Sequence, residues 1–302
     1  MSLSIDQAAL RIRAGGLVAF PTETVYGLGA NALDAAAVRQ IYELKRRPAT
    51  SPLIVHVASV EMARQITAEW PPVAEELARC WWPGPLTLVL PKREAVPDIV
   101  TAGLPAVGVR MPAHPIALAL IELAGVPIAA PSANLFAGIS PTTAEHVRAA
   151  FGDAVDVIEG GPARVGIEST VVAIENGSLR LLRPGMISLG DLELAAAPKA
   201  AHPSPGMHAR HYSPRTPLFL IRDPRELPEG RGAYLWWRNA TDVARSVRMS
   251  ADAPSYAARL YAVLHELDAE GLDWIAVELP PNEPEWAAIH DRLRRAAGAL
   301  GS

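Results

Sequence analysis

The 302-residue sequence has a single cysteine, Cys80, and no marked excess of charge of either sign. One cysteine excludes a disulfide within the chain and a zinc site built from cysteines. Its position beside Trp81 and Trp82 predicts a small, buried apolar side chain rather than a nucleophile. The 28 Lys and Arg residues against 32 Asp and Glu residues leave a net charge of −4. This balance argues against a stable nucleic-acid complex, although a local basic groove is compatible with it.

Long uninterrupted hydrophobic segments are also absent. Residues 111–144 carry one formal charge, at Glu122, but prolines such as Pro112 and Pro131 interrupt this stretch too often for a membrane span. The N-terminus, residues 1–6, has neither the basic region nor the apolar segment of a signal peptide. With 50% apolar and 20% charged residues, the composition predicts a folded cytoplasmic protein without membrane association.

Two common catalytic motifs are missing, because the sequence has no Gly-Lys dipeptide of a P-loop and no Gly-x-Ser-x-Gly nucleophile elbow. Residues 27–32 match the Gly-x-Gly-x-x-Ala dinucleotide pattern. However, the first glycine comes seven residues after Phe20, where the preceding strand is expected to end. The next expected strand ends in Val55-His56-Val57, with no acidic residue to hold a ribose. We therefore interpret this match as coincidental.

The hydrophobic pattern of the first two thirds of the chain predicts an α/β fold. Strands are expected at 17–20, 53–57, 86–90, 107–110, 126–130 and 155–158, and helices up to 14, at 34–45, from 60, and at 71–82, 114–124 and 142–151. Asn176-Gly177 between two β-rich runs predicts a hairpin over 169–183. Helices and strands together with a hairpin favour a twisted mixed sheet with flanking helices.

The composition changes after Leu194. Residues 195–217 are rich in Ala, Pro, His and Ser and lack periodicity, which is typical of a linker. A second, smaller α/β pattern follows, with strands expected at 218–221, 233–237 and 274–279 and helices at 254–269 and 284–297. We therefore predict a catalytic domain at 1–194, a linker at 195–217 and a C-terminal domain at 218–302.

Seven motifs follow one another between Ala9 and Gly190. They are PTETVYGL (21–28), KRRPATSPLIVH (45–56), WPGPLT (82–87), VRMP (109–112), PSAN (131–134), ESTV (168–171) and LRPG (182–185). In this order they resemble the YrdC/Sua5 family of threonylcarbamoyl-adenylate synthases. SPGMHARHYSP at 204–214 resembles the linker of the longer, two-domain Sua5 branch. The resemblance implies a YrdC-like twisted mixed sheet followed by a small, Rossmann-like Sua5 domain.

The resemblance also implies a reaction. L-Threonine, bicarbonate or CO2, and ATP would be joined into L-threonylcarbamoyl-AMP and pyrophosphate, for N6-threonylcarbamoyladenosine (t6A37) modification of tRNA. ATP with Mg²⁺ would be a substrate complex, with no permanently bound cofactor and no metal held by protein side chains. The downstream tRNA threonylcarbamoyl-transfer machinery would be the partner. Attack of a carbamate oxygen on the α-phosphorus depends mainly on positioning and on neutralising phosphate charge.

The candidate catalytic residues are Lys45, Arg47 and Arg110. Lys45 and Arg47 lie at the end of an expected helix and can form a phosphate clamp, with lysine as a point charge and arginine as a fork. The alternative is an ordinary helix C-terminus that carries solvated cations. A chain with only three lysines favours the clamp. Ser51 is either a hydroxyl donor to ATP or a turn residue before Pro52.

Six residues are candidates for threonine binding: Thr22, Thr24, His56, Arg110, Ala130 and Thr170. Thr22 and Thr24 follow a strand end, where α/β proteins place ligands, or else belong to an extended polar segment. His56 in its apolar strand would ordinarily be a core histidine, whereas the resemblance makes it a threonine contact. The resemblance also assigns Thr170, an ordinary β-former, and the backbone of Ala130 to threonine.

Arg110 ends an apolar run, and a buried guanidinium needs a partner. That partner is either an internal Asp or Glu or the α-carboxylate of threonine. We favour the carboxylate of threonine, because it matches the fork of the guanidinium.

Nine residues are candidates for ATP binding: Lys45, Arg47, Ser51, Ala106, Ser132, Asn134, Ser140, Arg183 and Tyr212. For Ser132 and Asn134 the alternative is capping of a turn, and for Ser140 it is the N-cap of the helix near 142. Arg183 could also be a solvated strand end. The family often carries Ser-Gly where this chain has Phe136 and Ala137, so no contact is assigned there.

The linker sequence is unusual for a spacer, because it contains two histidines, one arginine and one tyrosine between His208 and Tyr212. This composition favours a segment that folds over a ligand, and the resemblance places Tyr212 at the nucleotide. A lid would exclude water from a reactive mixed anhydride. The alternative is a solvated tether.

Two rival functions remain at this stage. Carbamoyl-adenylate-handling relatives in hydrogenase maturation carry zinc fingers, which a chain with one cysteine cannot form. An RNA-binding module with a YrdC-like fold is the alternative from another class, and the net charge of −4 argues against it.

Overall fold

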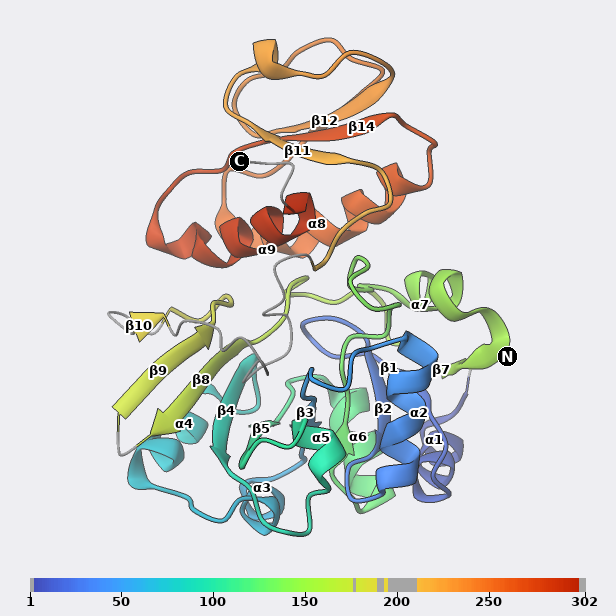
Figure 1. Ribbon diagram of the computed structural model, residues 1–302, viewed down its shortest axis with the longest axis vertical. Helices are drawn as coiled ribbons and strands as arrows, with labels where there is room; N and C mark the ends of the chain where they lie inside the picture. The colour runs from blue at the N-terminus through green and yellow to red at the C-terminus, as the bar shows by residue number, and fades with distance from the viewer. Residues whose placement is uncertain (1–2, 176–177, 189–192, 195–210, 299–302) are drawn as a thin grey trace.

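The computed structural model describes residues 3–175, 178–188, 193–194 and 211–298, and they form two α/β domains with separate sheets (Figure 1). The N-terminal domain contains α1 (Ile5–Arg13), β1 (Val18–Phe20), β2 (Gly27–Asn31), α2 (Ala35–Lys45), β3 (Ile54–His56), α3 (Val60–Ile66), α4 (Pro72–Trp81), β4 (Leu86–Pro91), α5 (Asp98–Thr101), β5 (Ala106–Arg110), α6 (Pro115–Ala124), β6 (Ile128–Ala129), α7 (Ala144–Phe151), β7 (Asp156–Val157), β8 (Thr170–Glu175), β9 (Ser178–Arg183) and β10 (Glu193–Leu194). The C-terminal domain contains β11 (Leu218–Ile221), β12 (Gly232–Trp236), β13 (Arg245–Arg248), α8 (Ala253–Asp268), β14 (Trp274–Glu278) and α9 (Ala287–Ala297).

The strands described in the N-terminal domain form one sheet in the order β10-β9-β8-β4-β5-β3-β6-β2-β1-β7. Pairs such as β3/β5 and β4/β8 are parallel, whereas β4/β5 and β1/β2 are antiparallel. The predicted mixed sheet is therefore confirmed, as is the β8/β9 hairpin, whose turn residues 176–177 lie outside the described residues. The register of β3 and β5 pairs His56 with Arg110, which brings two candidate site residues to neighbouring strand ends.

The glycine-rich segment 27–31 is a strand that the hydrophobic pattern did not predict. β2 runs antiparallel to β1, with Gly27 opposite Phe20. A Cβ atom on Gly29 would lie 2.7 Å from the Phe20 ring and 2.8 Å from Ile128. These glycines therefore make room for core side chains, and the interpretation that the dinucleotide pattern is coincidental agrees with this packing.

Helix boundaries follow local capping. The carboxylate of Asp34 accepts hydrogen bonds from the N–H groups of Ala36 and Ala37 at the start of α2, which ends at Lys45 as predicted. One expectation is wrong: Cys80 is exposed, and the buried residues of α4 are Ala74, Leu77 and Ala78. The alternative role of Ser140 as the N-cap of α7 is excluded, because Thr143 is the N-cap and the Ser140 hydroxyl donates to Glu168.

The C-terminal domain has a parallel sheet in the order β11-β14-β12-β13, of which β13 was not predicted. Helices α8 and α9 lie between this sheet and the N-terminal domain (Figure 1). Val25, Ile139 and Ile167 of the N-terminal domain join the same apolar cluster as Tyr256 and Leu260 of α8. The two domains therefore share part of one hydrophobic core.

Close approach of the domains depends on Gly166, which has a left-handed backbone (φ +79°). A Cβ atom there would lie 2.4 Å from the carbonyl oxygen of Ala257 in α8. Any side chain would push this loop away from α8. Among the residues that the structure describes, none of the helices has both the length and the apolar character needed to cross a membrane.

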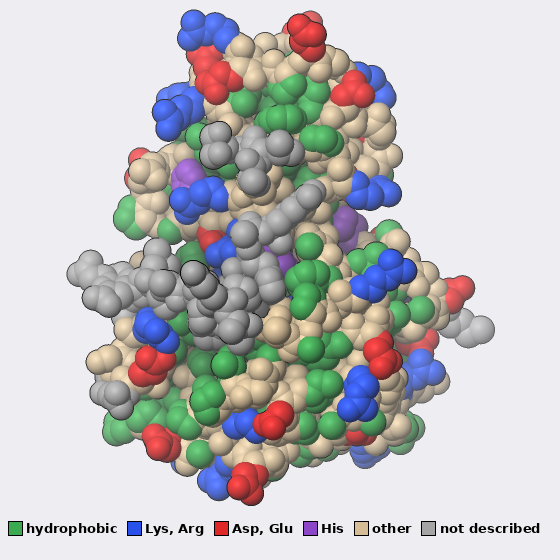
Figure 2. Space-filling view, viewed as in Figure 1, with side chains coloured by type: hydrophobic (Ala, Val, Ile, Leu, Met, Phe, Trp, Pro, Cys, Tyr) green, Lys and Arg blue, Asp and Glu red, His purple; other side chains and the backbone are tan. Residues whose placement is uncertain are grey.

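Two histidines stack across the domain boundary, at a waist where Figure 2 shows purple histidine side chains between the domains. The ring centres of His146 in α7 and His265 in α8 lie 3.9 Å apart, and the ring planes are nearly parallel, at 18°. Burial, and then the neighbouring His146, lower the pKa of His265 to about 4. Burial also lowers the pKa of His146. Both rings are therefore neutral at pH 7.

We expect the protein to lose stability as the pH falls from about 6.5 to about 4. In this window the unfolded state binds a proton on residue 265 that the folded state does not, so the free energy of unfolding rises with pH. The contribution of His265 is on the order of 2 kcal/mol. Urea unfolding of the wild type and of His265→Gln at pH 7.5 and pH 5 measures it. A decline with acid that is equally steep in both proteins would contradict the assignment.

Candidate active site

A cavity lined by many polar residues lies in the N-terminal domain, and its lining residue Glu168 contacts α8 and α9 of the C-terminal domain. Among the predicted site residues, those lining it are Thr22, Thr24, Arg47, His56, Arg110, Ala130, Ser132, Arg183 and Tyr212. They come from the ends of β3, β5 and β9, from the segments that follow β1, α2 and β6, and, for Tyr212, from the segment before β11. Residues that are distant in sequence thus converge on one site.

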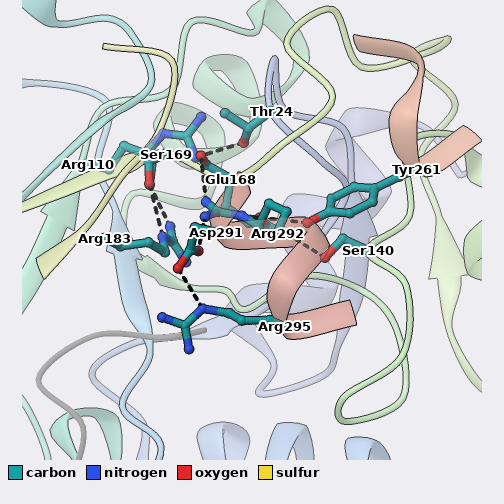
Figure 3. Close-up of polar contacts among 10 residues, drawn as sticks. All are labelled: Thr24, Arg110, Ser140, Glu168, Ser169, Arg183, Tyr261, Asp291, Arg292 and Arg295. Atoms are coloured by element: carbon teal, nitrogen blue, oxygen red, sulfur yellow. Dashed lines mark hydrogen bonds and ion pairs between the residues drawn. The ribbon is translucent and has the colours of Figure 1, made fainter. Parts of the chain in front are cut away.

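Arg110 is buried in the cavity lining and has three protein partners. Its Nη1 donates to Thr24 Oγ1 at 2.9 Å (Figure 3). Its Nη2 atom lies 2.7 Å from Glu23 Oε1, and its Nε donates to the Gly84 carbonyl at 3.2 Å. The structure therefore contains the internal acid that the sequence analysis disfavoured as the partner of Arg110. The guanidinium still lines the cavity, so a substrate carboxylate as a further partner stays a prediction.

Three of the other predicted threonine contacts, Thr22, Thr24 and His56, line the cavity together with Arg110. The hydroxyl of Thr22 donates to the Val25 carbonyl at 2.6 Å and lies 2.9 Å from the hydroxyl of Thr24. Burial, and then the charge of Arg110, lower the pKa of His56 to about 3, so its imidazole is neutral. Within the described part of the chain, His56 Nδ1 has no hydrogen-bond partner.

Arg47 and Arg183 are the other two arginines that line the cavity. Arg47 donates to the carbonyls of Ser51 and Pro52 at 3.2 and 3.0 Å, and burial lowers its pKa to about 10. Arg183 donates to the carbonyl and to the hydroxyl of Ser169, both at 3.0 Å (Figure 3). Both side chains are buried, which excludes the alternative that Arg183 is a solvated strand end.

Lys45 is also buried, but it does not line the cavity. Its ammonium group donates to the carbonyl of Ser132 at 2.7 Å and to the carbonyl of Asn134. Burial, and then the charge of Arg47, lower its pKa well below the ordinary value. The alternative of a solvated helix end is therefore wrong for Lys45, which instead ties α2 to the segment after β6.

The remaining predicted residues lie outside the cavity lining. Asn134 donates to the carbonyls of Leu135 and Gly138, at 2.7 and 2.9 Å. Ser51 contributes its carbonyl to Arg47. Thr170 donates its hydroxyl to the Ile187 carbonyl at 3.2 Å, away from the lining. Ala106 begins β5, four residues before Arg110, and an extended strand separates the two by about 13 Å.

Three lining residues with polar side chains were not assigned from the sequence: Glu168, Ser169 and His211. Glu168 and Ser169 belong to the quoted ESTV motif, and alternation along the strand puts Ser169 rather than Thr170 in the lining. His211 immediately precedes Tyr212, so its place follows from that of the linker. Linker residues 195–210 lie outside the described residues.

Tyr212 closes one side of the cavity and has a left-handed backbone (φ 62°), which is uncommon for an aromatic residue. Its hydroxyl has no hydrogen-bond partner among the described residues. Burial raises its pKa, so the hydroxyl keeps its proton. No group of three or more His, Cys, Asp or Glu side chains in the described ranges is placed to hold a metal ion.

Comparison with known proteins relates this arrangement to one family. The model described as "Telomere recombination" matches residues 11–185, and the model for the C-terminal domain of threonylcarbamoyl-AMP synthase matches residues 170–298. A threonylcarbamoyl-AMP synthase of Pyrococcus abyssi is 42% identical and one of Bacillus subtilis is 40% identical, over 96% and 97% of this chain and 93% of each relative. The crystal structure of Pyrococcus abyssi Sua5 with L-threonine matches with a TM-score of 0.91 and 41% identity, covering 97% of this chain and 94% of that one.

The fold and the cationic cavity define a two-domain nucleotidyltransferase with a YrdC-like N-terminal domain. More particularly, the chain belongs to the Sua5 family of threonylcarbamoyl-AMP synthases.

Proposed function

We propose that this chain joins L-threonine, bicarbonate or CO2, and ATP into L-threonylcarbamoyl-AMP and pyrophosphate, and that the product serves t6A37 modification of tRNA. The observation that carries the proposal is the charge of the cavity. Arg47, Arg110 and Arg183 line it together with one carboxylate, Glu168, and His56, one of two lining histidines, is neutral. A buried site with net positive charge suits a triphosphate and an amino-acid carboxylate.

We assign the two substrates to two groups of residues that line the cavity. Arg110, with Thr22, Thr24, His56 and the backbone of Ala130, is proposed to hold threonine. The fork of the guanidinium suits its carboxylate, and the hydroxyl groups and neutral imidazole suit its hydroxyl and amino groups. Arg47, Arg183, Ser132 and Tyr212 are proposed to hold ATP, which enters as its Mg²⁺ complex.

The chemistry then follows from positioning. The threonine amine combines with CO2 and releases a proton to form a carbamate, and a carbamate oxygen attacks the α-phosphorus of ATP while pyrophosphate leaves. Arg47 and Arg183 neutralise charge on the phosphates as it shifts to the leaving group. The downstream tRNA threonylcarbamoyl-transfer machinery is the proposed consumer of the product.

Amino-acid selectivity tests this function. The protein is incubated with MgATP, bicarbonate and threonine, serine or valine, without RNA; pyrophosphate is measured and adenylates are identified by mass spectrometry. Threonine should give the highest turnover. A polar site strongly rejects valine, which lacks the hydroxyl, whereas the methyl group that serine lacks is worth only about 1–3 kcal/mol. Equal turnover with valine, or none without RNA, would contradict the proposal.

The proposed domain organisation assigns residues 1–194 to catalysis and 195–217 to a linker that covers the active site, with 218–302 as the C-terminal domain. His211 and Tyr212 support this assignment, because both line the cavity.

Tyr212→Phe tests the proposed role of the linker. The hydroxyl is a protonated donor without a partner among the described residues, so we expect it to donate to ATP. Its loss should raise the KM for ATP about two- to tenfold, for a bond worth about 0.5–1.5 kcal/mol. The KM for threonine should stay constant. Tyr256→Phe, in the core of the C-terminal domain, is the matched control. Unchanged ATP kinetics in Tyr212→Phe would argue for a linker that does not touch the nucleotide.

A further inference from the structure

Glu168 connects the cavity to the C-terminal domain. Its carboxylate accepts hydrogen bonds from three elements: Ser140 Oγ at 2.5 Å, Tyr261 of α8 at 3.2 Å, and Nε of Arg292 of α9 at 2.7 Å (Figure 3). Arg292 Nη2 also donates to the Glu168 carbonyl at 3.4 Å. An acidic side chain in the cavity wall is thus held by two helices of the other domain.

Arg292 also has a hydrogen-bond partner within its own helix. It is completely buried, and its Nη1 donates to Asp291 at 2.6 Å. Asp291 in turn accepts from Arg295 at 2.9 Å (Figure 3). A buried guanidinium needs such partners, and held this way it has one orientation. The side chain therefore places a positive charge at a defined point behind the cavity wall.

The charge of Arg292 offsets the negative charge that Glu168 places in the cavity wall. Burial opposes ionisation of Glu168, but the charges of Arg292 and Arg183 and the hydrogen bonds from Ser140 and Arg292 outweigh it, so the pKa of this carboxyl lies below its ordinary value. Glu168 is therefore an anion in the wall of a cavity that takes anions. Without Arg292, its charge would repel the phosphates of ATP with only Arg183 nearby to offset it.

The same helix also holds the linker. The Arg292 guanidinium carbon lies 5.2 Å from the centre of the Tyr212 ring. The backbone carbonyl of Arg295 accepts from the His211 N–H at 3.2 Å and from the Ser213 hydroxyl at 3.4 Å. Helix α9 thus holds residues 211–213 at points on either side of Tyr212, which lines the cavity.

We propose that Arg292 is a positioning residue for the ATP side of the active site, by which the C-terminal domain neutralises Glu168 and holds Tyr212 against the cavity. This inference rests on the proposed function. It gives the C-terminal domain a direct part in nucleotide binding, although none of the cavity-lining residues described above belongs to its sheet or helices.

The test compares four variants of the full chain: Arg292→Met, Arg292→Lys, the double variant Glu168→Gln/Arg292→Met, and Arg294→Met. Arg294 is the matched control, because it is exposed on the same helix and donates only within it, to the His290 carbonyl, in the contacts described. Pyrophosphate release gives the KM for ATP and for threonine, and calorimetry with a non-hydrolysable ATP analogue gives binding without turnover.

We expect Arg292→Met to raise the KM for ATP and the dissociation constant of the analogue at least about tenfold, because it leaves a buried charge unpaired. The KM for threonine should change much less. The double variant should recover part of the ATP affinity, since a neutral amide needs no cation. Arg292→Lys should fall between Arg292→Met and the wild type, because it keeps the charge but loses the fork.

Acid should also rescue Arg292→Met selectively. Loss of the guanidinium raises the pKa of Glu168, so a proton can neutralise it, and the activity ratio of variant to wild type should rise from about pH 8 to about pH 6. An unchanged analogue affinity in Arg292→Met, or a double variant no better than the single one, would overturn the inference. If Arg292→Met does not fold, an Arg292→Lys variant with wild-type ATP affinity and wild-type pH profile overturns it. In each case a wild type that makes the adenylate keeps the proposed function intact.

Discussion

Arg110→Ala is expected to lower threonine-dependent pyrophosphate release at least about a hundredfold, because two charge-assisted hydrogen bonds to the threonine carboxylate, each worth about 1.5–3 kcal/mol, would be lost. The loss should appear as weak threonine binding in calorimetry, with the affinity for an ATP analogue nearly unchanged. Arg79→Ala, on the exposed side of α4, serves as the control.

Stability must be separated from binding in this experiment, because Arg110 is also the partner of buried Glu23 at 2.7 Å. Leaving that carboxylate unpaired should lower the free energy of unfolding by about 3–5 kcal/mol. The double variant Arg110→Ala/Glu23→Gln removes the unpaired charge and should recover much of this stability without recovering threonine binding. Normal threonine affinity in either variant would show that Arg110 serves only the internal pair.

Lys45→Met should weaken binding of the ATP analogue about ten- to a hundredfold, although Lys45 does not line the cavity. Its ammonium group holds the carbonyls of Ser132 and Asn134, and methionine fills the same space without donors. The segment that carries Ser132 would then lose its anchor to α2. The affinity for threonine should change less, since the partners of Arg110 remain in place.

Arg46→Met provides a sharp comparison for Lys45→Met. Arg46 is the next residue in the same motif, but its side chain is exposed. Charge alone would make the two variants similar, whereas anchoring makes only Lys45→Met defective. Calorimetric titration of both variants and the wild type with the ATP analogue decides the matter, and equal affinities in all three would contradict the anchoring role of Lys45.

Most of the fold could be predicted from the sequence, because local signals define most elements. Asp34 at the start of α2 and the Asn-Gly pair between β8 and β9 are such signals. Strand β2 could not be predicted, because its glycines leave space for the Phe20 ring and Ile128, which are neighbours only after folding. Cys80 was misplaced for a similar reason, since the orientation of α4 decides which of its faces is buried.

The site was predictable where ordered motifs mark single positions, as with Arg47, His56 and Arg110, which all line the cavity. It was not predictable where a role depends on a partner far along the chain. Glu168 and Arg292 are separated by 124 residues and meet only because α9 packs against the N-terminal domain. For Lys45, the motif indicated the residue but not that backbone carbonyls would be its partners.

The apolar cluster shared by the two domains has a consequence for how the protein unfolds. Val25, Ile139 and Ile167 bury their side chains among residues of α8, α9 and the small sheet. The C-terminal domain is near the lower size limit for an independent core, so these contacts should stabilise it. Separating the domains would expose apolar surface on both at once. The chain should therefore melt as one cooperative unit, and a substitution in this cluster should lower the melting temperature of both domains together.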